Sequence, residues 1–135
     1  MSEFKYDVSF RIFHPNLNPD EICQTLHLQA TTKWRSGEQR KTPKGRLLPN
    51  VYDKSYCSFK LDQVHDMELP EFLRYWNSRF LKFKEYFMNI HSSGGRLEYF
   101  IGWYSKGNSG EVFNVSLLEQ LATLKIDLAI DFYSD

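Results

Sequence analysis

The residues best suited to acid–base chemistry in this 135-residue chain are three carboxylates in its C-terminal half. Asp127 and Asp131 lie in a segment where apolar and polar residues alternate, so both project from one face of a predicted strand. Glu98 has the same phase in a second alternating segment. Paired carboxylates can transfer protons or bind a cation, but on an open sheet they more often stay solvated. We therefore predict a contact surface, the acidic sheet face, consisting of Glu98, Tyr104, Asp127 and Asp131.

A rival interpretation uses the same face of the sheet for a small ligand or for catalysis. It requires a pocket on which Tyr56, Lys60, Glu98 and Asp131 converge. The sequence contains no nucleophile-elbow, paired-cysteine or phosphate-loop motif. Its histidines are scattered, and none has a Cys, Asp or Glu at a sequence spacing typical of metal sites: His14, His27, His65 and His91. We expect a protein that is not an enzyme and that uses no cofactor or metal.

A second candidate surface is a basic segment in the first half of the chain. Between positions 33 and 46 there are six basic residues and a single acidic one, Glu38, and Trp34 adds a flat apolar ring beside them. This basic loop consists of Lys33, Trp34, Arg35, Arg40, Lys41, Lys44 and Arg46. From Glu111 onward, five acidic residues oppose Lys125 alone.

Three interpretations of the basic loop compete. Its charges could pair with the acidic end of the same chain and simply be solvated. They could steer an oppositely charged protein partner to a surface anchored by Trp34. They could also contact nucleic acid, but a protein with 17 basic and 17 acidic residues lacks the broad positive field typical of that class.

Composition places the chain among ordinary soluble domains. Apolar residues make up 41% and charged residues 25%, and no apolar run approaches the length of a membrane helix. The N-terminus does not resemble a signal peptide. Cys23 and Cys57 both lie among apolar neighbours, which favours two reduced, structural thiols, although their spacing permits a disulfide. We expect a cytoplasmic protein without membrane contact.

Periodicity predicts four strands and three helices. Alternation of apolar and polar residues predicts strands over 4–13, 56–61, 97–104 and 126–133. Apolar residues three or four positions apart predict helices over 19–28, 69–90 and 117–124. Asn18 and Ser116 are the expected caps of the first and last helix, with Glu21 and Glu119 completing capping boxes. Residues 30–54 read as a long loop with a short strand over 46–51, because glycine and proline interrupt it repeatedly.

These elements predict one α+β domain over residues 1–135. Each strand has one apolar and one mixed face, so we expect a mainly antiparallel sheet of four to five strands with three helices packed on one face only. The element order is β-α-(β)-β-α-β-α-β. Strand order and oligomeric state are not specified by these patterns.

Several short motifs resemble a bacterial family known as domain of unknown function 4279. They are Pro19-Asp20-Glu21-Ile22, Trp34-Arg35-Ser36-Gly37-Glu38 and the stretch from Leu121 to Leu128 followed by Asp131-Phe132-Tyr133. One departure is Tyr56-Cys57-Ser58, where members of the family tend to have a tryptophan. The resemblance implies a fold and no catalytic residues. Small bacterial domains of this sort occur as immunity proteins beside secreted toxins, an analogy that favours a toxin domain as the partner.

We therefore expect a protein-binding module, with an immunity protein that neutralises a bacterial toxin as the specific hypothesis. Affinity would come from aromatic anchors such as Trp34, Trp103 or Tyr104. Steering would come from the basic loop or from the acidic sheet face. The acidic face would be the contact if the toxin were a nuclease with a basic cleft.

Overall fold

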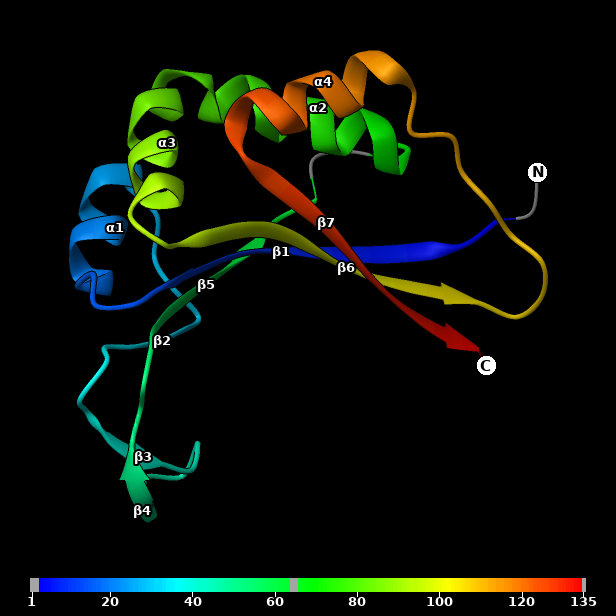
Figure 1. Ribbon diagram of the computed structural model, residues 1–135. Coiled ribbons are helices and arrows are strands. Elements are labelled where there is room, and N and C mark those ends of the chain that lie inside the picture. The colour runs from blue at the N-terminus through cyan, green and yellow to red at the C-terminus, as the bar shows by residue number, and fades with distance from the viewer. Residues whose placement is uncertain (1–2, 64–65, 135) are drawn as a thin grey trace.

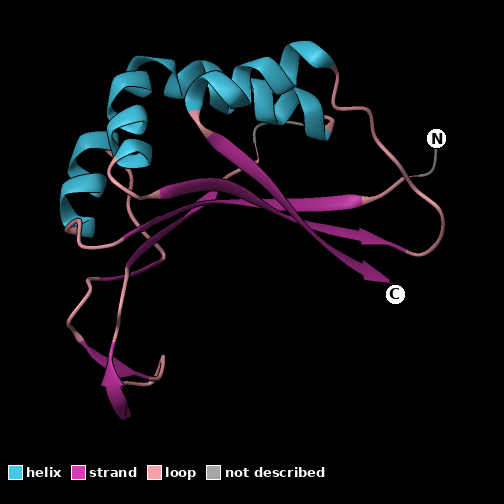
Figure 2. Cartoon of the chain, in the orientation of Figure 1, coloured by secondary structure: helices cyan, strands magenta, loops and turns pink. Residues whose placement is uncertain are grey.

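The computed structural model describes residues 3–63 and 66–134 of the chain, so His65 lies outside the described residues. Helices cover one face of a sheet and leave the other face bare (Figures 1 and 2). The predicted class, α+β with a mainly antiparallel sheet and helices on one face, is confirmed. None of the helices in the described part of the chain combines the length and the hydropathy that crossing a membrane requires.

The elements follow one another in the predicted order, with additional short strands. The strands are β1 (Lys5–His14), β2 (Thr32–Trp34), β3 (Gln39–Lys41), β4 (Leu47–Val51), β5 (Ser55–Leu61), β6 (Arg96–Ser105) and β7 (Ile126–Ser134). The helices are α1 (Pro19–Leu26), α2 (Leu69–Phe80), the 3-10 turn η1 (Leu81–Phe83), α3 (Lys84–Ser92) and α4 (Val115–Leu124).

Five strands form the main sheet in the order β2-β5-β1-β6-β7. β1 lies at the centre, antiparallel to both β5 and β6, and β2 is antiparallel to β5. β7 is parallel to β6, because α4 carries the chain back to the end of the sheet where β6 begins, and β7 starts there. The result is a mixed sheet with two free edges, a three-residue strand on one side and a nine-residue strand on the other.

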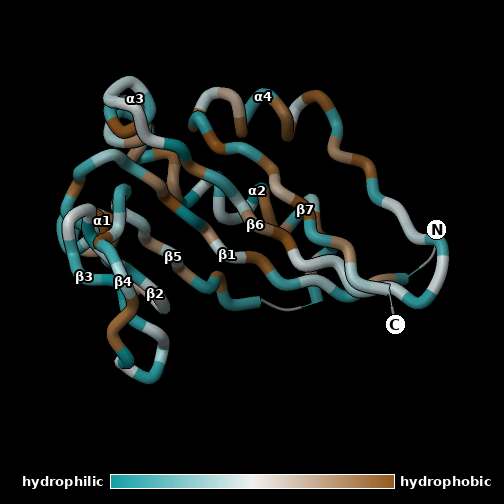
Figure 3. Tube along the Cα trace, turned by 60° about the horizontal axis from the view of Figure 1, so that its bottom comes forward, coloured by the Kyte–Doolittle hydropathy of each residue, from teal (hydrophilic) through white to brown (hydrophobic). Residues whose placement is uncertain are grey.

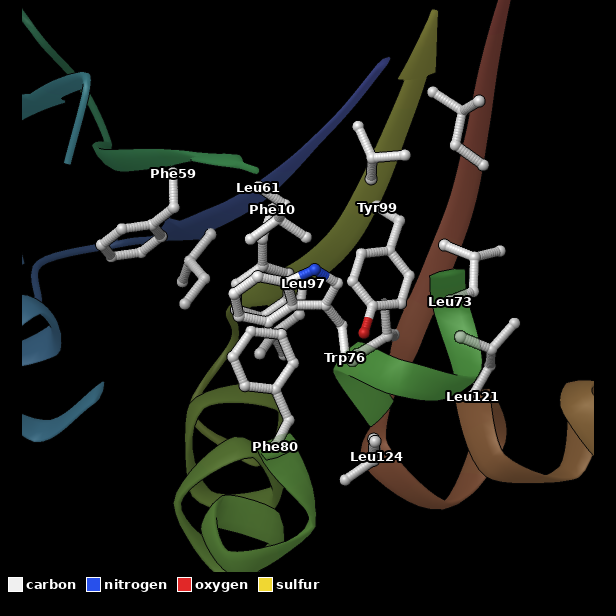
Figure 4. Packing of buried hydrophobic residues seen from close by; sticks show 14 of the residues in the cluster. Phe10, Phe59, Leu61, Leu73, Trp76, Phe80, Leu97, Tyr99, Leu121 and Leu124 are labelled. Carbon is white, nitrogen blue, oxygen red and sulfur yellow. The ribbon is translucent and has the colours of Figure 1, made fainter. Parts of the chain in front are cut away.

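Alternation along the strands separates the two faces, as the sequence predicts. Phe10, Phe59 and Tyr99 point to the helices and are almost fully buried. Phe10 and Tyr99 pack against Phe80 of α2, and Phe59 packs against Phe10 (Figure 4). Burying large rings of this kind stabilises a fold by about 3–5 kcal/mol each, judged by truncation to alanine.

The long helix predicted over 69–90 is divided in the structure. η1 separates α2 from α3, and the chain changes direction there (Figure 1). α2 packs on α4, whereas α3 packs on β6 and α4. The bend lets Phe87 and Ile90 reach the same core as Phe72 of α2, which a straight helix would have carried past the sheet.

The N-cap residue agrees with the sequence prediction at α1 and differs at α4, and Glu21 of the predicted α1 capping box accepts instead from the Tyr86 hydroxyl. Asn18 caps α1 by accepting a hydrogen bond from the Asp20 backbone N–H at 3.0 Å. The predicted cap Ser116 is wrong, because α4 begins at Val115 and its cap is Asn114. The Asn114 Oδ1 accepts from the Leu117 backbone N–H at 3.0 Å and from Arg74 at 2.7 Å. An asparagine in extended conformation performs the same capping chemistry two residues earlier.

The predicted loop over 30–54 is ordered into three short strands. β2 joins the main sheet, and β3 and β4 form a separate hairpin that projects from the body of the molecule (Figures 1 and 3). Gly45 adopts a φ of 88° at the hairpin turn, a conformation that favours glycine.

Candidate functional site: the open face of the sheet

The bare face of the sheet is here called the open face. It carries the residues of each strand that alternate with the core residues and point away from the helices. Its central feature is a buried carboxylate between two guanidinium groups. Glu98 on β6 accepts a hydrogen bond from Arg11 Nε at 2.8 Å and pairs with Arg11 Nη2 at 2.7 Å. Arg96 pairs with the other oxygen of the same carboxylate. Two cations therefore hold one anion, and the trio keeps a net positive charge.

Both arginines lie over aromatic rings of the same face. The Arg11 guanidinium carbon is 4.1 Å from the centroid of the Phe100 ring, and that of Arg96 is 4.2 Å from the centroid of Phe13. Stacking of this kind contributes about 0.5–2 kcal/mol per pair, more where water is excluded. The ion pairs and the rings together hold both guanidinium planes in place.

The aromatic rings continue outward to the β2 edge of the sheet. The Phe13 ring lies 5.1 Å from Tyr56, which lies 4.6 Å from Trp34, and Trp34 stacks on Tyr52 at 4.3 Å. These side chains come from β6, β1, β5, β2 and the turn after β4. We call the set the aromatic–arginine row: Tyr52, Trp34, Tyr56, Phe13, Arg96, Arg11 and Phe100.

The row remains accessible although its members contact one another. All five rings are half-buried, as is Arg11, and Arg96 is exposed. A row of half-exposed rings with interleaved cations is a surface on which another molecule can stack or be clamped without prior rearrangement.

A different chemistry occupies the far end of the open face. Tyr104 donates a hydrogen bond from its hydroxyl to Asp7 Oδ2 at 3.0 Å, and the Tyr133 hydroxyl donates to Asp131. The two tyrosine rings stack with centroids 5.0 Å apart. Hydrogen bonds to these carboxylates raise the pKa of Tyr104 and of Tyr133, so both phenols stay protonated and act as donors.

Comparison with known families assigns this chain to a family. The family model described as domain of unknown function, DUF4279, matches residues 2–135. The chain belongs to the DUF4279 family. Comparisons with curated proteins and with solved structures found no match. The expected resemblance is confirmed over almost the whole chain, and the family's description names no activity, so the open face of this DUF4279 member must be interpreted from its own chemistry.

The acidic sheet face predicted for this DUF4279 chain is divided by the structure. Asp131 and Tyr104 meet at the tyrosine–carboxylate end, and Asp127 is exposed on β7 beside Glu98. Glu98 itself is only 2% exposed, so it adds no accessible negative charge. Sequence patterning placed it correctly on this face but could not show that two arginines neutralise it.

The basic loop is divided as well. Lys33 points to the helix side, where its ammonium pairs with Asp20 of α1 at 2.6 Å, and this contact raises the lysine pKa. Trp34 joins the aromatic–arginine row. Arg35 donates to the Asn16 carbonyl at 3.4 Å. The remaining basic residues are exposed on and beside the projecting β3–β4 hairpin: Arg40, Lys41, Lys44 and Arg46.

Pairing of the basic loop with the acidic end of the same chain is not seen. The ion pairs found in residues 3–63 and 66–134 are Arg11–Glu98, Arg96–Glu98 and Lys33–Asp20. None of them joins the hairpin to the segment after Glu111. The hairpin charges of this DUF4279 protein therefore face solvent.

The predicted anchor Trp103 does not lie on the open face. It is 7% exposed on the helix side, stacks on Phe4 at 3.8 Å and donates to the Ser109 hydroxyl. It is therefore a core residue, as the alternation of its strand implies, and Trp34 and Tyr104 remain as accessible aromatic candidates.

The convergent pocket required by the rival interpretation is not formed. Tyr56 and Lys60 lie on β5 and Asp131 on β7, with β1 and β6 between them. Three strand spacings separate these groups by about 14 Å across the sheet. A cleft of about 670 Å³ lies elsewhere, between Tyr6, Gln63, Leu69 and Glu111. A second of about 340 Å³ lies between α2 and α4.

The described part of this DUF4279 chain also offers no metal site. No cluster of three or more His, Cys, Asp or Glu side chains able to hold an ion occurs there.

The residues that sequence reasoning missed are Arg11, Phe13, Tyr52, Arg96 and Phe100. For the four residues on β1 and β6 the signal was present, because aromatic and arginine residues occupy the supposedly polar phase of these strands, whereas Tyr52 follows β4 and had no such signal.

Proposed function

We propose that this chain is a non-enzymatic protein-binding module that docks its partner on the open face, acting as an immunity protein that neutralises a bacterial toxin domain. The observation that carries the proposal is the aromatic–arginine row. Its rings and guanidinium groups remain accessible. The described helices lie on the opposite face of the sheet (Figure 2).

The composition and rigidity of the row support protein recognition. Tryptophan, tyrosine and arginine are the side chains most enriched at the energetic centres of protein interfaces. Arg11 is held by Glu98 and by the Phe100 ring, so little side-chain freedom remains to be lost on binding. A face fixed in this way favours tight association over loose adsorption.

Charge on the projecting hairpin supports an electrostatically steered encounter. The hairpin that carries its exposed basic residues lies near the β2 edge of the sheet (Figure 1), and Trp34 is the last residue of β2. An acidic or strongly polar rim on the partner would be attracted there, with association faster at low salt. On this proposal the protein acts in the cytoplasm, and its two free thiols, Cys23 and Cys57, suit a reducing compartment.

The test is whether a toxin domain is encoded beside this gene and, where one is, whether it binds this protein, measured by calorimetry and by protection of growth. We expect Trp34→Ala to weaken the Kd about tenfold or more, since truncating a hot-spot ring costs at least about 1.4 kcal/mol. Arg40→Glu should slow association chiefly at low salt. The matched control is Lys84→Glu, an exposed lysine on helix α3, which should leave affinity unchanged.

Absence of a neighbouring toxin gene, or of any complex with its product, would remove the immunity-protein assignment. An affinity that Trp34→Ala leaves unchanged would remove the open face as the docking surface. Circular dichroism of each variant separates lost binding from lost folding.

A second candidate function is binding of single-stranded nucleic acid, and a specific observation favours it. Half-exposed rings with interleaved arginines on a bare sheet are also what base stacking uses. The carboxylates Asp7 and Asp131 at the far end of the same face oppose it, because they repel phosphate. Titration with a labelled oligonucleotide at two salt concentrations distinguishes the two, since nucleic-acid binding weakens steeply with salt.

A further inference from the structure

The two edges of the sheet differ in a way that has a consequence for assembly. β2 ends one side after three residues, too short to pair extensively with another chain. β7 ends the other side with nine residues, and its outer backbone groups have no partner among the backbone hydrogen bonds of the described residues. Figure 3 shows β7 at the outer side of the strand series β5, β1, β6, β7.

β7 also lacks the features by which proteins usually protect a free edge. It contains no proline, lysine or glycine, and its two charges, Asp127 and Asp131, both point to the open face. On the other face Ile130 is 49% exposed and Phe132 is 54% exposed. Apolar side chains beside an unpaired strand edge mark a site for pairing with another strand.

The sequence of β7 is self-complementary when two copies run antiparallel. The twofold axis of such a pair must pass through a residue, which then lies opposite its own copy. An axis between two residues would set backbone N–H and C=O groups that point outward against groups that point inward. The register that pairs the whole strand is centred on Ile130. It sets Ile130 opposite its own copy and Leu128 opposite Phe132 on the apolar face. On the open face it sets Asp131 opposite Ala129 and Asp127 opposite Tyr133.

Neighbouring registers are excluded by charge. Centring on Ala129 would set Asp127 opposite Asp131, and centring on Asp131 would set that carboxylate against its own copy. Like charges directly opposite each other destabilise a strand pair. The register with the longest overlap is thus also free of carboxylate repulsion, which is the property expected of a strand that pairs with itself.

We propose that the β7 edge is a homodimer interface, in which two copies pair antiparallel through β7 about a twofold axis at Ile130. The two five-stranded sheets then form one continuous sheet, with both open faces on the same side. One strand pair buries less area than a standard interface of about 1,200 Å² or more, so the association is reversible and depends on concentration. The proposal does not depend on the proposed toxin binding, since Trp34 lies at the opposite edge.

A charge-complementation experiment tests both the interface and its register. Sedimentation equilibrium of the wild-type protein over about a hundredfold concentration range, up to about 1 mM, should show monomer and dimer. Ile130→Glu and Ile130→Lys each set like charges opposite on the axis, and each should raise the dimer Kd about tenfold or more. An equimolar mixture of the two variants should restore the dimer, because glutamate then faces lysine.

Matched controls protect the interpretation. Leu47→Glu introduces the same charge at an exposed residue, 70% accessible on β4, and should leave self-association unchanged. Thermal unfolding of each Ile130 variant checks that the half-exposed site tolerates the charge. A wild-type protein that stays monomeric overturns the proposal, even if β7 then pairs with a strand of another protein. Dimers that survive Ile130→Glu, or variants that fail to complement each other, overturn the interface or its register.

Discussion

On the helix side of the sheet, Phe10 is fully buried, with ring centroids 4.7 Å from Phe80 and 5.7 Å from Tyr99. On the open face one strand away, Phe100 is half-buried and its main neighbour is the guanidinium of Arg11. The same residue type is surrounded by hydrocarbon in one place and by cations and water in the other. The comparison shows that an aromatic ring in an alternating strand indicates burial only when its phase places it under the helices.

The largest expected difference between the two faces is in the loss of unfolding free energy when each phenylalanine is truncated. Phe10→Ala should lower the free energy of unfolding by about 3–5 kcal/mol, because the cavity lies inside a packed ring cluster. Phe100→Ala should cost less than about 1.5 kcal/mol, since water can reach the vacated site. Denaturant titration measures both, and equal losses would contradict the division between core and binding face.

A smaller effect is expected from the ion pairs of the open face. A double-mutant cycle of Arg11→Ala and Glu98→Ala should give a coupling energy of about 1–2 kcal/mol. The carboxylate of Glu98 is only 3% exposed, so losing one cation is costly, although Arg96 still pairs with it. Exposed ion pairs usually contribute less than about 1 kcal/mol. The exposed pair Lys33–Asp20 is the internal control, and equal coupling in the two cycles would show that Glu98 is not shielded.

The smallest expected effect is a pH dependence from the polar end of the helix side. Burial lowers the pKa of His14 below its ordinary value of 6.5, and the neutral ring accepts at Nδ1 from the backbone N–H groups of Asn16 and Leu17. The unfolded chain therefore binds the proton more readily, so this stabilisation is present above about pH 6.5 and is lost as pH falls through the lowered pKa.

Unfolding free energies measured at a series of pH values test this, with His14→Gln as the variant. The variant should lose less stability than the wild type between neutral and mildly acidic pH. His91→Gln, at an exposed position on α3, should retain the wild-type slope. An unchanged slope in His14→Gln would assign the acid sensitivity to other groups.

Much of the fold was predictable from local pattern. Alternation correctly placed the four long strands and assigned Phe10, Phe59 and Tyr99 to the core. The break at η1 was not predictable, because the apolar spacing runs through it without interruption. Inside residues 30–54, the short strand predicted over 46–51 corresponds to β4, whereas β2 and β3 were missed because each has only three residues and little apolar signal.

The candidate site was predictable only in part. Trp34 and Asp131 were recognised from the sequence, and both lie on the open face. Glu98 was placed on the correct face, but its burial between Arg11 and Arg96 was not foreseen. Arg11 lies on β1, which periodicity could not identify as the neighbour of β6, whereas Arg96 lies two residues before Glu98 on β6 itself, just ahead of the predicted strand.

By itself, the sequence determined which side chains of each strand share a face, because the side-chain direction in a strand alternates with every residue. Tertiary structure alone decided which strands are neighbours. The pairing of β1 with both β5 and β6 brings Tyr56, Phe13 and Phe100 into one row, and the parallel return of β7 leaves a long edge unpaired. Local periodicity is set by backbone geometry within a few residues, whereas strand order depends on free energies summed over contacts distant in the chain.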